Sequence, residues 1–134
     1  MVHKLDDRIF VSGQIAPAEV AELARQGFAL IVNNRPDHEE PGQPEAFEIE
    51  AAAAASGIAY RYVPVAQLTP EAIEAMRDAM ASTEGPVLAF CKSGTRSTYL
   101  WALARSLDGT DGDTLVQDAA AAGFDLNPIR RFLR

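Results

Sequence analysis

The chain has 134 residues, 48% of them hydrophobic, which suits one globular domain (1–134) with one sizeable core. Its net charge of −7 argues against non-specific binding to nucleic acids or anionic membranes, although a local cluster of N–H groups can still bind a small anion. No apolar run approaches the ~20 residues that span a bilayer, residues 1–8 carry no signal-peptide pattern, and the single cysteine forms no internal disulfide, so we expect a cytoplasmic protein.

Short apolar runs alternate with amphipathic segments along the chain. The apolar runs predict strands at 9–13, 29–33, 60–65 and 86–90. The spacing of apolar residues predicts helices at 16–26, 44–56, 69–84, 95–107, 114–122 and from 127 onwards. Strands that alternate with helices are typical of an α/β fold, here a small, mostly parallel sheet of about four to five strands flanked by helices.

The fourth expected strand ends in the only cysteine, Cys91, and a short loop separates it from Arg96 at the start of a helix. Ligands of α/β sheets bind at the carboxyl ends of strands, which is where this loop lies. The backbone N–H groups of such a loop, together with the helix N-terminus, point at one place and form an anion site. A thiol in that place is expected to lose its proton readily, and the thiolate is a nucleophile.

Cys91 is therefore our candidate nucleophile. A lone cysteine is more often an inert buried residue, but a core cysteine would lie mid-strand, whereas small and polar residues follow Cys91. Arg96 can hold an anion through two parallel hydrogen bonds, and a cation at a helix N-terminus suggests an anion beside it. The other residues that we assign to the anion-binding loop are Lys92, Ser93, Gly94, Thr95 and Ser97. Gly94 lets amides point inward and the hydroxyls can donate to a thiolate or an oxyanion, while helix capping for Ser97 and a solvated side chain for Lys92 are the alternatives.

These residues carry a resemblance to known families. The loop 91–97 resembles the active loop of single-domain rhodaneses, which often reads C-x-S-G-x-R-S, and is one residue shorter than the C-x5-R loop of protein tyrosine and dual-specificity phosphatases. Over nearly its full length the chain resembles a bacterial family of phosphatase-like domains, also named as sulfur transferases, that occur alone or fused to β-lactamase-like metallohydrolases. The segments that carry this resemblance are 9–15, 34–37, 39–44, 62–65, 91–97 and 122–126. The resemblance implies a protein-tyrosine-phosphatase-like fold and, as a partner, a metallo-β-lactamase-like persulfide dioxygenase.

Two chemistries fit the cysteine loop. In our first interpretation Cys91 attacks a sulfane sulfur and becomes a persulfide, and a second nucleophile then removes the outer sulfur. This rhodanese-like sulfur transfer suits the short C-x4-R loop, because sulfur needs less room than a phosphoryl group, and it requires no general acid. The substrate would be a small anionic or persulfide compound. No cofactor or metal is expected, since two histidines and one cysteine do not build a typical zinc site.

The alternative is a phosphatase, in which Cys91 attacks a phosphorylated substrate and a carboxylic acid protonates the leaving oxygen. In related phosphatases this acid is an Asp on the loop after the strand that precedes the cysteine strand, but here that loop, 66–69, contains no acid. The loop after the second expected strand offers substitutes in Asp37, His38, Glu39 and Glu40, and we expect an acid or substrate contact from Asp37, Arg35 or His38. A third interpretation is a non-catalytic module that binds anions or carries a persulfide.

Overall fold

The computed structural model describes all 134 residues and has a five-stranded sheet at its centre. The strands lie in the order β1-β2-β5-β3-β4. Only β1 runs antiparallel to its neighbour, so the mostly parallel sheet predicted from the sequence is confirmed. The strands are β1 (Val2–Lys4), β2 (Ile9–Ser12), β3 (Leu30–Asn33), β4 (Ala59–Tyr62) and β5 (Val87–Phe90).

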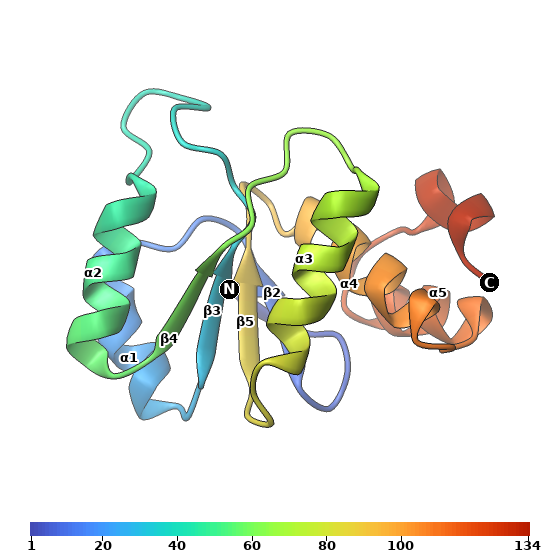
Figure 1. The fold of residues 1–134 in the computed structure, drawn as a ribbon, viewed down its shortest axis with the longest axis horizontal. Helices are drawn as coiled ribbons and strands as arrows, with labels where there is room; N and C mark the ends of the chain where they lie inside the picture. The colour runs from blue at the N-terminus through green and yellow to red at the C-terminus, as the bar shows by residue number, and fades with distance from the viewer.

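Helices cover both faces of the sheet (Figure 1). On one side lie α1 (Val20–Arg25) and α2 (Ala46–Ser56), and on the other α3 (Pro70–Ala81), α4 (Thr95–Leu107) and α5 (Gly112–Ala121). Two 3-10 helices complete the chain, η1 (Pro17–Glu19) and η2 (Asn127–Phe132). None of the helices combines the length and the apolar character that crossing a bilayer requires.

The central strand β5 shows why the sheet is buried on both sides. Its four residues are all buried, and successive side chains point to opposite faces. Val87 and Ala89 pack with the residues beneath α3 and α4, whereas Leu88 and Phe90 pack with those of α1 and α2. A continuous apolar run is therefore the expected sequence for this strand, because a parallel sheet between two helical layers has no polar face.

The structure differs from the sequence prediction mainly at the sheet edges. The strand β1 was not predicted, since it is only three residues long and carries no apolar alternation. The strand predicted at 60–65 ends at Tyr62, although the amides of Val63 and Val65 still donate to the carbonyls of Asn33 and Asn34, both at 2.9 Å. The helices predicted at 16–26 and after 127 are partly or wholly 3-10 in form.

One edge of the sheet collects the carboxyl ends of the four parallel strands, β2, β5, β3 and β4. The loops that leave this edge bring together residues that lie far apart in the sequence. They are 13–16 after β2, 34–45 after β3, 63–69 after β4 and 91–94 after β5.

Candidate active site

Cys91 directly follows β5 and is fully buried. Its sulfur accepts a hydrogen bond from the backbone N–H of Gly94, at 3.1 Å. Gly94 has a φ of 93°, in the left-handed region that favours glycine, and it forms the N-cap of α4. The loop thus reverses within three residues and directs an amide at the sulfur.

Most amides of the cysteine loop have no acceptor in the protein. The first amide of α4 to donate within the helix is that of Thr98, to the carbonyl of Gly94, at 3.0 Å. The amides around it that make no hydrogen bond to backbone or side chain are those of Lys92, Ser93, Thr95, Arg96 and Ser97. Such a group of free N–H donors beside a helix N-terminus is an anion-binding arrangement, and Cys91 lies within it.

The guanidinium of Arg96 is anchored by its two Nη nitrogens. Nη1 donates to the carbonyl of Val65 at 2.8 Å and to Oε2 of Glu39 at 2.7 Å, and Nη2 donates to Oε1 of Glu39 at 2.9 Å. Glu39 therefore holds the end of the guanidinium in a two-pronged contact. The Nε–H group takes no part in these contacts.

Charge interactions fix the ionisation states of Glu39 and Arg96. The hydrogen bond from Arg96, with a further one from Arg35, lowers the pKa of Glu39 to about 2 despite its partial burial. The hydrogen bond to Glu39 raises the pKa of the Arg96 guanidinium, and its interaction with Cys91 adds to this effect. Glu39 is consequently a carboxylate, and Arg96 a cation, throughout the ordinary pH range.

Arg35 connects the loop 34–45 to the rest of the site. Its side chain is only 2% exposed. It donates to Glu39 at 2.9 Å, to Glu40 at 2.9 Å and to the side-chain oxygen of Gln14 at 3.0 Å. Glu40 in turn lies 3.5 Å from Nζ of Lys92, and its pKa is lowered by the hydrogen bond from Arg35 and by the charge of Lys92. One buried guanidinium thus joins two carboxylates that reach the two ends of the cysteine loop.

The structure gives the other predicted loop residues different partners from those expected. The hydroxyl of Ser97 is buried and donates to the side-chain oxygen of Asn34 at 2.8 Å, and the hydroxyl of Ser93 donates to that of Thr95 at 3.1 Å. The hydrogen-bond donor to the sulfur is therefore the Gly94 amide, and none of the hydroxyls that the sequence suggested takes this role.

Two candidates from the loop after β3 turn toward α2. Oδ1 of Asp37 accepts a hydrogen bond from the amide of Ala46, the first residue of α2, at 2.8 Å. The side chain of His38 is 77% exposed and lies 3.8 Å from a carboxylate oxygen of Glu45. Asp37 thus organises the start of the helix, the imidazole of His38 lies in solvent, and neither side chain forms a hydrogen bond or ion pair with Cys91 or Arg96.

The sequence reasoning missed three groups that shape the site. Asn34 is fully buried, donates to the carbonyl of Val63 at 3.0 Å and accepts from Ser97. Gln14 and the carbonyl of Val65 hold the two arginines. The signal for Asn34 and Gln14 was present, since each is a polar residue just after an apolar strand at the carboxyl edge of the sheet.

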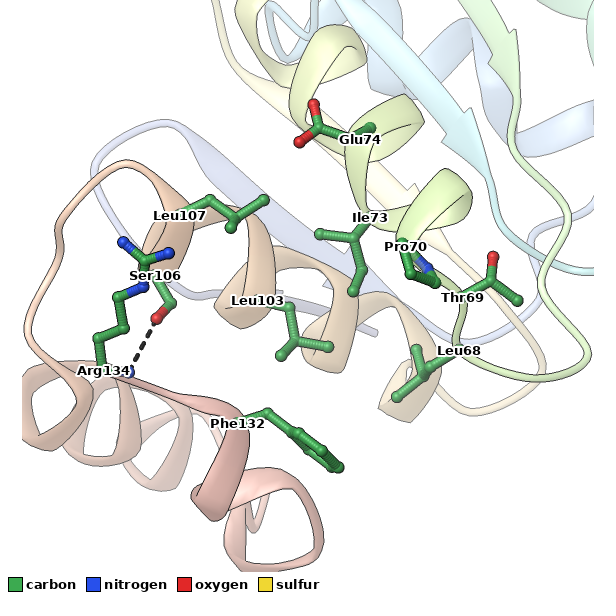
Figure 2. Close-up of a pocket in the computed structure, with 10 residues that line it drawn as sticks. All are labelled: Leu68, Thr69, Pro70, Ile73, Glu74, Leu103, Ser106, Leu107, Phe132 and Arg134. Atoms are coloured by element: carbon green, nitrogen blue, oxygen red, sulfur yellow. Dashed lines mark hydrogen bonds between the residues drawn. The ribbon is translucent and has the colours of Figure 1, made fainter.

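A separate apolar cavity of about 460 Å³ lies between α3, α4 and η2 (Figure 2). The side chains of Leu68, Ile73, Leu103 and Phe132 point toward it, and no residue of the cysteine loop lines it. No three His, Cys, Asp or Glu side chains lie together as a set that could hold a metal ion.

The chain is similar over most of its length to curated relatives. The family described as "Beta-lactamase hydrolase-like protein, phosphatase-like domain" matches residues 2–108. Beta-lactamase hydrolase-like proteins of Agrobacterium fabrum and Xylella fastidiosa (strain Temecula1) are 40% and 43% identical to it over 133 residues. These matches cover 97% of this chain and 31% of each relative, so the chain spans about a third of their length.

Solved structures share the fold. A candidate phosphatase from Neisseria meningitidis has a TM-score of 0.84 and 32% sequence identity, covering 96% of this chain and 93% of that one. PTPMT1 has a TM-score of 0.72 at 13% identity, covering 98% and 93% of the two chains. The phosphatase-like fold implied by the sequence resemblance is confirmed, and the chain belongs to the family of phosphatase-like domains of β-lactamase hydrolase-like proteins.

Proposed function

We propose that the chain is a phosphatase-like hydrolase that releases phosphate from phosphorylated substrates through a phosphocysteine on Cys91. The observation that carries the proposal is the geometry of loop 91–96. The sulfur lies among backbone N–H groups without protein acceptors, beside a guanidinium whose Nε–H takes no part in the contacts with Glu39 and Val65. This arrangement suits a phosphoryl group, whose non-bridging oxygens need fixed donors while charge shifts during transfer.

The reaction takes two steps. In the first, the Cys91 thiolate forms an S–P bond, the P–O bond to the leaving group breaks, and its electron pair leaves with the departing oxygen. In the second, a water oxygen attacks phosphorus, the S–P bond breaks, and the thiolate returns as inorganic phosphate and a proton are released. The loop amides and Arg96 hold the phosphoryl oxygens in both steps.

Sulfur transfer was our first interpretation of the sequence, and the comparisons favour the alternative. The matched family is described as phosphatase-like, and the structure at 32% identity is that of a candidate phosphatase. The loop geometry would also hold a persulfide, so the two chemistries are separated by experiment on the same preparation.

The test is phosphate release from p-nitrophenyl phosphate. We expect Cys91→Ser to abolish release, and Arg96→Lys, which keeps the charge but loses the planar fork, to lower kcat by about 100- to 1000-fold. Arg25→Lys is the matched control, because Arg25 is an exposed arginine on α1 that pairs only with Glu22. Activity that persists in Cys91→Ser would overturn the proposal. A sulfur adduct on Cys91 after treatment with thiosulfate, without phosphate release, would favour sulfur transfer instead.

A further inference from the structure

The loop after β4 offers nothing that protonates a leaving group. Its residues 66–69 read Ala-Gln-Leu-Thr and contain no carboxylate. This loop nevertheless lies beside the site, because the carbonyl of Val65 accepts a hydrogen bond from Arg96. Any carboxylic acid for the departing oxygen therefore has to come from another loop, and the loop after β3 places a carboxylate, that of Glu39, against Arg96.

Glu39 is the carboxylate on that loop that touches Arg96, and it is committed to holding this residue. Both of its oxygens are engaged, Oε1 with Arg35 and Arg96 and Oε2 with Arg96, at 2.7 to 2.9 Å. Two guanidinium partners stabilise the ionised form and lower the pKa of Glu39 to about 2. A carboxylate in this state holds no proton to donate at neutral pH.

The other three candidate proton donors of this loop have different surroundings. Glu40 accepts a hydrogen bond from Arg35 and pairs with Lys92, and both contacts favour its ionised form. Asp37 accepts the amide hydrogen of Ala46 at the start of α2. The imidazole of His38 lies in solvent near Glu45. Glu39, Glu40 and Asp37 thus have structural partners other than a substrate, and the exposed imidazole of His38 forms no hydrogen bond with Cys91 or Arg96.

We propose that the leaving group departs from Cys91 unprotonated, and that the substrates are phosphoryl compounds whose leaving group is a stable anion at neutral pH. This inference rests on the proposed function and narrows it. When the S–P bond forms and the P–O bond breaks, the electron pair remains on the leaving oxygen as a carboxylate, a phosphate or an acidic phenolate. Acyl phosphates and phosphoanhydrides meet this condition. Alkyl phosphates do not, nor does phosphotyrosine, whose phenol has a pKa of about 10.

The experiment measures kcat/KM for a series of aryl phosphates, from the dinitrophenyl to the phenyl ester, with acetyl phosphate and inorganic pyrophosphate as two further substrates. Without a general acid we expect kcat/KM to fall by at least about 100-fold from the dinitrophenyl to the phenyl ester. We also expect hydrolysis of acetyl phosphate, of pyrophosphate or of both, and the pattern identifies the acyl phosphate or the phosphoanhydride as the preferred class.

Two variants provide controls. We expect Asp37→Asn and Glu40→Gln to leave the ratio of kcat/KM for the dinitrophenyl ester to kcat/KM for the phenyl ester unchanged. This ratio does not depend on the fraction of folded protein. A fall in kcat/KM of less than about 10-fold from the dinitrophenyl to the phenyl ester would overturn the inference, because it would show that the leaving oxygen is protonated. A larger ratio of kcat/KM between the dinitrophenyl and phenyl esters in either variant would also overturn the inference. So would failure of the protein to hydrolyse both acetyl phosphate and pyrophosphate. Absence of any Cys91-dependent turnover of the dinitrophenyl ester would instead refute the proposed function itself.

Discussion

At the scale of single residues, Glu39 sets the orientation of Arg96. It takes both Nη nitrogens and leaves the Nε–H side for a phosphoryl oxygen. We expect Glu39→Gln, which cannot accept two charge-assisted hydrogen bonds, to lower kcat/KM by about 10- to 100-fold through loss of this orientation. Glu40→Gln is the control, since Glu40 contacts Arg35 but not Arg96. Steady-state kinetics check the prediction, and equal losses in the two variants would contradict it.

The carboxylate of Glu39 also makes the free energy of unfolding depend on pH. The pKa of Glu39 falls from 4.5 to about 2 on folding, so its contribution is fully present above pH 4.5 and is lost as the pH falls toward 2. With the side chain 25% exposed, solvent screening limits this contribution to on the order of 1–2 kcal/mol. Urea unfolding of the unmodified chain and of Glu39→Gln between pH 6 and pH 2 measures it. We expect the stability difference between the two to shrink toward low pH, and a constant difference would refute the prediction.

At the scale of elements, the cysteine loop depends on its glycine. A Cβ at Gly94 would lie 3.1 Å from Cζ of Phe124 and 3.4 Å from the carbonyl oxygen of Ser12, in a backbone with a φ of 93°. We expect Gly94→Ala to distort the loop, withdraw the amide from the sulfur and lower kcat by about 100-fold. Gly109→Ala is matched in strain, with a φ of 98°, but has open space around it. It should lose stability and keep its kcat per folded molecule, and a similar loss of kcat in both variants would count against the loop's role.

The sequence predicted the central elements more reliably than the peripheral ones. The strand β5 is a continuous apolar run that leads into a polar loop, and the helix α4 begins at Thr95 and ends at Leu107 as predicted. The strand β1 could not be predicted because its pairing with β2, rather than any pattern of its own, makes it a strand. The strand β4 lies at the sheet edge and is mostly exposed, so its boundaries are set by its neighbour β3.

The candidate site was predictable from the sequence only in part, because some of its contacts join residues that lie far apart in the sequence. Cys91, Gly94 and Arg96 are close in sequence, and their spacing predicts a shared loop. The contact between Glu39 and Arg96 joins residues 57 positions apart, and it depends on how the loop after β3 folds. Glu39 was considered as a substitute acid, and the two arginines that ionise it became visible only in the structure.

At the scale of the whole molecule, Asp6 ties the N-terminal hairpin to α4. Its Oδ2 accepts hydrogen bonds from Nε1 of Trp101 at 2.7 Å and from Arg105 at 3.0 Å, which lie 95 and 99 positions away in the sequence. Asp6→Ala would leave the buried indole N–H without a partner, and we expect a loss of about 2 kcal/mol in the free energy of unfolding. Asp7→Ala is the control, because Asp7 is exposed and makes none of these contacts. Equal stabilities of the two variants in urea would show that Asp6 does not hold the hairpin.

In the proposed reaction, Cys91 carries a phosphoryl group during turnover. The measurement that tests it most directly is the intact mass of the chain, quenched in acid within one turnover of dinitrophenyl phosphate, with peptide mapping of the modified residue. We expect the mass of one PO₃ group on Cys91, a burst of one dinitrophenol per chain, and neither in Cys91→Ser. Phosphate release without a covalent adduct, or a thiosulfate-derived sulfur adduct on Cys91 in a chain that never accepts phosphate, would contradict it.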